Sequence, residues 1–85
     1  MNFTPSTNSL SEQLIDTLEH YFNTLEEQQA SNLHEMVITQ VEKPLIEFVL
    51  NRTQGNQSKT ANMLGINRNT LRKKILQYNI VIDLN

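Results

Sequence analysis

The sequence predicts an all-α protein of one small domain with four helices. Its 85 residues include only two glycines and two prolines, while Leu, Glu, Gln and Asn are abundant. Apolar residues recur at intervals of three and four, which is the spacing of one helix face rather than the alternation of a strand. Polar segments containing Asn, Ser or Gly separate these stretches and supply the signals that start and end helices.

The first helix is expected over about residues 10–26, because Ser9 followed by Glu12 fits a capping box. Residues 1–9 are polar and contain Pro5, so they are predicted to form a flexible N-terminal arm. One apolar stripe runs along this helix and consists of Leu10, Leu14, Leu18, Tyr21, Phe22 and Leu25.

A longer second helix is expected at residues 33–52, after a polar linker at 28–32, with Asn32 and Glu35 suggesting its cap. Pro44 lies near its middle and should kink the helix without breaking it, because the apolar pattern continues in register. A helix that is apolar on several faces is buried on several sides, so the additional partner is expected to be another subunit. The apolar set is Leu33, Met36, Val37, Ile38, Val41, Leu45, Ile46, Phe48, Val49 and Leu50.

Two shorter helices are expected at residues 57–64 and 68–77, with Asn56 and Asn67 as their N-caps. Gly65 permits the sharp reversal between them, since a positive φ costs glycine little. This pattern is typical of a helix-turn-helix. Its expected small core consists of Leu64, Ile66, Leu71 and Ile75. The residues expected to face outward are Asn67, Arg68, Asn69, Thr70, Arg72, Lys73 and Lys74.

Further expectations follow from local chemistry. Ala61 is expected where the two helices cross closely, since only a small side chain fits there, and Met36 and Met63 are expected in the core. Gly55 is the C-cap candidate of the second helix. The tail at residues 79–85 could pack as a strand or as a last half-turn, and the sequence leaves both open.

The net charge of −2 conceals a strong asymmetry. Up to Glu47 there are eight acids and one base (1 − 8 = −7), and after it six bases and one acid (6 − 1 = +5). No acid lies between Phe48 and Ile82. A basic helix pair on an acidic body is the electrostatic footprint of nucleic-acid binding. The bases are Arg52, Lys59, Arg68, Arg72, Lys73 and Lys74.

Specific contacts can be assigned from these positions. Arg68 opens the fourth helix and can reach the O6/N7 edge of guanine, and Asn67 is expected to offer a contact to a base or phosphate as well as a cap. Helix N-termini also present free amides to phosphates. The equivalent residues of the third helix are Asn56, Ser58 and Lys59.

Other functions have weaker support. The basic run at residues 72–74 alone fits a solvated helix end, but its combination with the helix-turn-helix pattern favours DNA binding. His20 and His34 lack partners at ligand spacing, so no metal site is expected. There is no cysteine, phosphate loop or nucleophile motif, so we expect neither a cofactor nor an enzyme. With no membrane span or signal peptide, the predicted location is the cytoplasm.

Residues 55–74, GNQSKTANMLGINRNTLRKK, resemble the DNA-binding end of the Fis family of bacterial nucleoid-associated proteins. Related modules end NtrC-type activators. The likeness extends upstream through Val41-Glu42-Lys43-Pro44-Leu45 and Tyr21-Phe22, and so covers about residues 10–78.

The resemblance implies an intertwined homodimer that bends double-stranded DNA at degenerate sites and acts as a nucleoid-associated transcription regulator. It divides the chain into an arm at 1–9, a dimerisation core at 10–53, a helix-turn-helix at 54–78 and a tail at 79–85. It assigns base contacts to Arg68 and Asn67. It assigns the other contact residues mostly to the DNA backbone. These are Asn56, Ser58, Lys59, Thr70, Arg72, Lys73 and Lys74.

Three departures qualify these implications. Relatives that stimulate site-specific DNA inversion carry a longer β-hairpin arm than residues 1–9 provide, so recombinase activation is not expected. Contact with RNA polymerase stays open, because Gln54 stands where a basic residue is common. The fourth helix ends less basic than in close relatives, and the apolar tail past Tyr78 is an addition.

Two alternative functions remain. One is a narrower transcription factor or a detached NtrC-type output domain. The initiator Met and the complete first helix argue against the detached domain. The other is a protein-protein adaptor whose basic patch binds an acidic partner.

Overall fold

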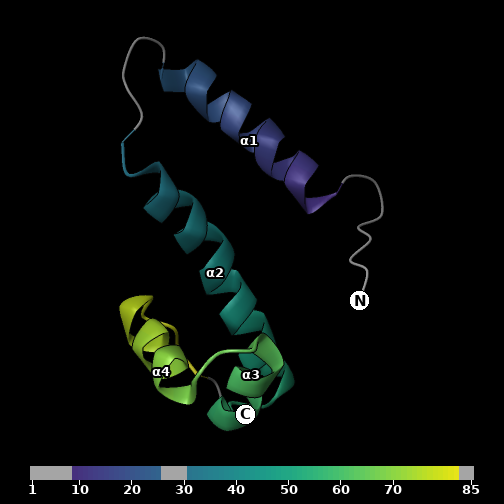
Figure 1. Cartoon of the computed structure of the whole chain (residues 1–85), viewed down its shortest axis with the longest axis vertical. Coiled ribbons are helices and arrows are strands. Elements are labelled where there is room, and N and C mark those ends of the chain that lie inside the picture. Colours follow the sequence, from purple (N-terminus) through teal and green to yellow (C-terminus); the bar gives the residue numbers. More distant parts are fainter. Residues whose placement is uncertain (1–8, 26–30, 83–85) are drawn as a thin grey trace. The chain divides into compact units, whose positions relative to one another are not determined.

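The structure, a computed structural model, describes residues 9–25 and 31–82, and every regular element in that part of the chain is an α-helix (Figure 1). The all-α class with four helices is therefore confirmed. The helices are α1 (Leu10–Leu25), α2 (Leu33–Arg52), α3 (Gln57–Leu64) and α4 (Arg68–Gln77). The predicted arm and most of the predicted linker lie outside the described residues. The chain divides into two compact units, Met1–Asn32 and Leu33–Asn85.

Helix α1 begins as its capping residue predicts. The Ser9 hydroxyl oxygen accepts the N–H of Glu12 at 3.1 Å. No residue of α1 is buried, although its rings at Tyr21 and Phe22 pack edge to face with centroids 5.8 Å apart. Ile15 and Phe22 remain 56% and 47% exposed. The apolar face of α1 is therefore left accessible by the other described residues.

Helix α2 continues through Pro44 in a single run of 20 residues. Proline has no N–H, so the carbonyl of Gln40 has no intrahelical donor at this point. The predicted cap at Asn32 is wrong. Its φ of 54° lies in the left-handed region, whereas an N-cap residue has extended backbone.

Helix α2 ends with a left-handed residue that is not a glycine. Gln54 has a φ of 57°, and its N–H donates to the Asn51 carbonyl at 3.2 Å. The N–H of the next residue, Gly55, donates to the Leu50 carbonyl at 2.9 Å, which completes a Schellman motif. Gly55 is also left-handed, with a φ of 82°, but the capping position predicted for it belongs to Gln54.

A glycine at position 54 should therefore stabilise the protein. Left-handed backbone is costly for a residue with a Cβ, and glycine removes that cost, so we expect Gln54→Gly to gain about 0.5–1 kcal/mol. Urea unfolding provides the measurement. Gln54→Ala keeps the Cβ and is the matched control. A gain for alanine equal to that for glycine would contradict this explanation.

The same terminal motif recurs after α3 and α4. Gly65 has a φ of 75°, and the N–H of Ile66 donates to the Ala61 carbonyl at 3.0 Å. After α4, Asn79 has a φ of 52°, and the N–H of Ile80 donates to the Ile75 carbonyl at 3.0 Å. The tail thus starts with a turn of this kind, and Ile80, which follows Asn79 in this turn, is buried.

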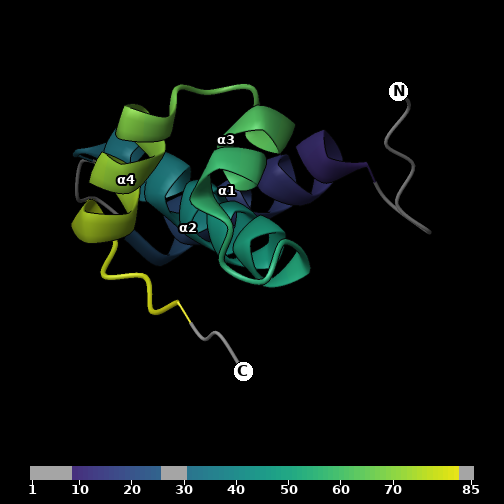
Figure 2. The ribbon, with the colours of Figure 1, turned by 90° about the horizontal axis from the view of Figure 1, so that it is seen from below.

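One apolar cluster joins α2, α3 and α4, which are seen from below in Figure 2. Ala61 is buried within it, as its small size predicts. The prediction for Met63 is wrong, because this side chain is 56% exposed on α3, while Met36 is half-buried. Partly buried Leu64, Ile66 and Ile82 pack against the cluster. Its buried members are Ile46, Leu50, Ala61, Leu71, Ile75, Tyr78 and Ile80.

A polar contact also holds α3 to the end of α2. Thr60 is fully buried, and its hydroxyl lies 2.7 Å from the Thr53 hydroxyl. The Thr53 hydroxyl also lies 3.2 Å from the Leu50 carbonyl, to which it can donate while it accepts from Thr60. A buried hydroxyl is costly when it has no partner, so this pair fixes the start of the helix-turn-helix on α2.

Candidate nucleic-acid interface

Both helices of the predicted helix-turn-helix begin with an asparagine cap, as expected. The side-chain oxygen of Asn56 accepts the N–H of Lys59 at 3.0 Å, and that of Asn67 accepts the N–H of Asn69 at 2.7 Å. Both caps have extended backbone, with ψ values of 102° and 144°. Since capping uses only the carbonyl oxygen, each amide NH₂ can still donate to a phosphate or a base.

The side chains predicted to contact DNA lie mostly on the accessible surface of α3 and α4. Arg68 is the first residue of α4, directly after the Asn67 cap, where the helix dipole and free amides favour an anion. Leu71 and Ile75 hold α4 in the core. The exposed predicted residues are Asn56, Ser58, Lys59, Asn67, Arg68, Thr70, Arg72 and Lys73.

Lys74 is less exposed than predicted. Its ammonium group donates to Oε1 of Glu42 at 2.9 Å, and its side chain is only 26% exposed. The hydroxyl of Tyr78 donates to the same carboxylate oxygen. Sequence reasoning missed this group because Glu42 precedes Lys74 by 32 residues, and no local pattern relates them.

These contacts shift the acidity of both partners. The pKa of Glu42 lies below its ordinary value of 4.5, chiefly because of the hydrogen bond from Tyr78. Burial opposes this shift, whereas the hydrogen bond from Lys74 and the charge of Lys74 add to it. The pKa of Tyr78 lies above its ordinary value of 10.0, chiefly because of the same hydrogen bond to Glu42 and then burial. The ionised carboxylate and the neutral phenol are therefore the favoured states.

The stability of the protein should consequently depend on the ionisation of Glu42. The pKa of Glu42 is lower in the folded protein than in the unfolded chain, so the ionised carboxylate stabilises the fold. This contribution is fully present above pH 4.5 and is lost as the pH falls through the pKa of Glu42 in the folded protein. Glu42→Gln should reduce the loss of stability on acidification, measured as urea midpoints from pH 7 to pH 3. Glu19→Gln on exposed α1 is the control. An acid response of Glu42→Gln identical to that of the wild type would contradict this role.

A basic residue outside the predicted contact set is also engaged. The guanidinium of Arg52, at the end of α2, lies 5.8 Å from the centre of the Phe48 ring. Both side chains are exposed, and Phe48 is 62% accessible. A cation over an aromatic face is a favourable contact that shields part of this apolar side chain from water.

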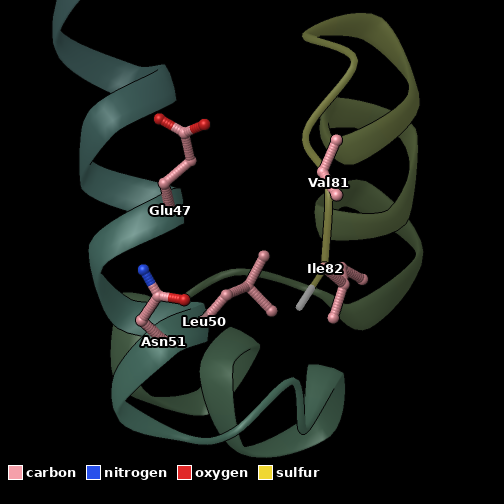
Figure 3. A pocket seen from close by; sticks show the side chains of 5 residues that line it. All are labelled: Glu47, Leu50, Asn51, Val81 and Ile82. Carbon is pink, nitrogen blue, oxygen red and sulfur yellow. The ribbon is translucent and has the colours of Figure 1, made fainter. Parts of the chain in front are cut away.

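A shallow pocket of about 190 Å³ lies between α2 and the tail (Figure 3). Glu47 and Asn51 of α2 face Val81 and Ile82 across it, with Leu50 between them. One carboxylate and one amide do not form an acid-base pair, so the pocket suggests no reaction.

Within residues 9–25 and 31–82, no group of three His, Cys, Asp or Glu side chains is placed to hold a metal ion, and His20 and His34 are both exposed. Among the described helices, none combines the length and apolar character that crossing a membrane requires.

Comparison with known proteins gives consistent matches. Residues 37–78 match the family model described as bacterial regulatory protein, Fis family. Proteins named DNA-binding protein Fis from Aliivibrio fischeri (strain MJ11) and Aliivibrio salmonicida (strain LFI1238) are 47% identical to the chain over 62 residues. This alignment covers 73% of the chain and 63% of each relative.

Proposed function

Because the chain belongs to the Fis family of bacterial regulatory proteins, we propose that it is a homodimer that binds double-stranded DNA and bends it. The relatives from Aliivibrio are named for DNA binding, and the chain spans 63% of their length.

The observation that carries DNA binding is the exposed basic surface of the helix-turn-helix. Lys59, Arg68, Arg72 and Lys73 are all exposed in a stretch that contains no acid from Phe48 to Ile82. Uncompensated positive charge on a helix pair attracts the phosphate backbone and releases its counterions. Its fixed position beside two helix N-termini adds backbone N–H donors.

Within this surface we assign base reading to Arg68 and Asn67, since they open α4 and present donors. Contacts to the DNA backbone are assigned to the remaining members of the set, among which Lys74 also bonds Glu42. These are Asn56, Ser58, Lys59, Thr70, Arg72, Lys73 and Lys74.

The homodimer is supported by apolar surface that one chain leaves accessible. Along α2, Ile38, Val41, Leu45 and Phe48 follow one another at intervals of three or four residues, and each is at least 40% exposed. Helix α1 adds Leu10, Ile15 and Phe22. A second copy would supply a partner for each of these two helix faces, so residues 10–53 form the proposed dimerisation core. Residues 54–78 form the proposed DNA-binding region.

The salt dependence of binding is the direct test of the proposed function. Fluorescence anisotropy with a duplex should show affinity falling steeply with salt concentration, because phosphate contacts release counterions. A shallow dependence, with tight binding to an acidic protein instead, would favour the adaptor alternative.

DNA bending leads to a separate prediction. Recognition helices on a compact dimer should stand closer than one turn of straight B-DNA, about 34 Å, so both can enter successive major grooves only if the duplex bends. Duplexes that differ only in central base pairs should therefore differ in affinity, with A·T-rich centres binding best. Gel mobility with circularly permuted sites measures the bend. Straight bound DNA, or indifference to the central sequence, would exclude this mechanism.

Bending at degenerate sites would allow the protein to organise the nucleoid and regulate transcription. We therefore propose a nucleoid-associated role in the bacterial cytoplasm. Nothing in the proposal requires a catalytic group, a cofactor or RNA polymerase. A narrower transcription factor would differ by occupying few genomic sites, which genome-wide mapping of bound DNA would reveal.

A further inference from the structure

The two halves of α2 on either side of Pro44 are held to α4 by different forces. After Pro44, Ile46 and Leu50 belong to the same buried cluster as residues of α4. Before Pro44, Glu42 receives hydrogen bonds from Lys74 and Tyr78 at the end of α4. Figure 1 shows α4 lying beside α2 over this stretch. The contacts of α4 therefore span the point at which the α2 backbone lacks a hydrogen bond.

We infer that Glu42, Lys74 and Tyr78 form a brace that fixes the direction of α4 relative to the N-terminal half of α2, and so makes Glu42 and Tyr78 positioning residues for DNA recognition. This inference rests on the proposed function, because α2 is assigned to the dimer core and α4 to DNA. The apolar cluster links α4 to the C-terminal half of α2, and the brace adds a link to the part of α2 before Pro44.

The geometry of the brace is suited to holding a direction. Lys74 and Tyr78 are four residues apart, so they lie on the same face at the end of α4. Both donate to one oxygen, Oε1 of Glu42. The body of Tyr78 is anchored in the apolar cluster and only 8% exposed, so its hydroxyl has little freedom to follow a displaced carboxylate. A change in the angle between α2 and α4 would therefore break both bonds.

The brace also gives a role to the acid that lies beside the basic helix. A carboxylate at this place opposes phosphate binding, because it reduces the positive potential of Lys74. If charge alone mattered, removing Glu42 would simply strengthen binding to every duplex. If Glu42 acts as a brace, its removal should instead weaken binding to specific sites, because only these sites require both reading helices at a fixed spacing.

The first experiment uses Tyr78→Phe, which removes one hydroxyl and no charge. Affinity should be measured on a preferred site and on a random duplex of equal length, at one salt concentration, together with the bend angle. We expect random-duplex affinity and salt slope to stay at wild-type values. Affinity for the preferred site should fall about fivefold, the size expected for one net hydrogen bond, and the bend should decrease. Tyr21→Phe makes the same chemical change on α1 and is the matched control.

The second experiment separates the brace from a charge effect. Glu42→Gln should lose discrimination between the two duplexes, and the double variant with Tyr78→Phe should lose no more than the worse single variant, because both remove the same link. Equal tightening on both duplexes by Glu42→Gln, with a steeper salt slope, would overturn the inference. Unchanged discrimination and bending in Tyr78→Phe would also overturn it.

A third measurement does not involve DNA. Hydrogen exchange of the free protein should be faster at the amides before Pro44 in Tyr78→Phe than in the wild type, while the C-terminal half of α2 keeps its protection. Exchange unchanged before Pro44 would overturn the brace even if DNA binding is normal. Wild-type protein that fails to bind any duplex would instead refute the proposed function, with the exchange result still deciding whether the brace exists.

Discussion

Leu45→Asp is expected to unfold the protein rather than to release a folded monomer. Leu45 is 48% exposed in the single chain, on the α2 stripe that the proposed dimer covers. Burial of such a side chain stabilises by about 1.5–3 kcal/mol, and an unpaired carboxylate in its place adds a desolvation penalty. The loss occurs twice in a symmetric dimer, so it approaches the whole stability of a small domain, about 5–15 kcal/mol.

Leu45→Asp should unfold the chain because the α2 surface that contains Leu45 is part of the proposed dimer interface. In an obligate dimer the interface and the core are the same structure, so stability depends on association. Circular dichroism should show the helical signal of Leu45→Asp lost, and the wild-type midpoint should rise with protein concentration. Gln40→Glu is the control, because it adds the same charge at an exposed position of α2. A helical, folded monomer at micromolar concentration in analytical ultracentrifugation would contradict the proposed dimer.

Arg68→Ala is expected to cost about 1–3 kcal/mol on a preferred site, or roughly 5- to 150-fold in affinity. Arg68 is the first residue of α4 and is exposed, so its guanidinium can donate two hydrogen bonds to one guanine. Its loss should relax base preference at one position of each half-site. Binding to a panel of sites with single base changes provides the measurement.

Lys73→Ala is the matched control for this prediction. Lys73 is exposed on the same helix and is assigned to phosphate, so its removal should weaken all duplexes alike and lower the salt slope by about one unit. If Arg68→Ala also weakens specific and random duplexes equally, then Arg68 contacts the backbone and the base-reading assignment is wrong.

The sequence by itself determined the helices and where the positive charge lies. The ranges of α2, α3 and α4 coincide with those expected from periodicity, and Asn56 and Asn67 cap as predicted. These features depend on hydrogen bonds between residues two to five apart, so a short window contains their cause. The charge asymmetry is a property of composition along the chain and required no structure.

Only the tertiary structure decided which side chains meet across the fold. Glu42 and Tyr78 are 36 residues apart, and their contact exists because the apolar cluster places the end of α4 against α2. The same packing buries Thr60 and leaves Met63 exposed, although residue type suggested the reverse. Such outcomes depend on distant parts of the chain packing together, and local sequence signals do not carry that information.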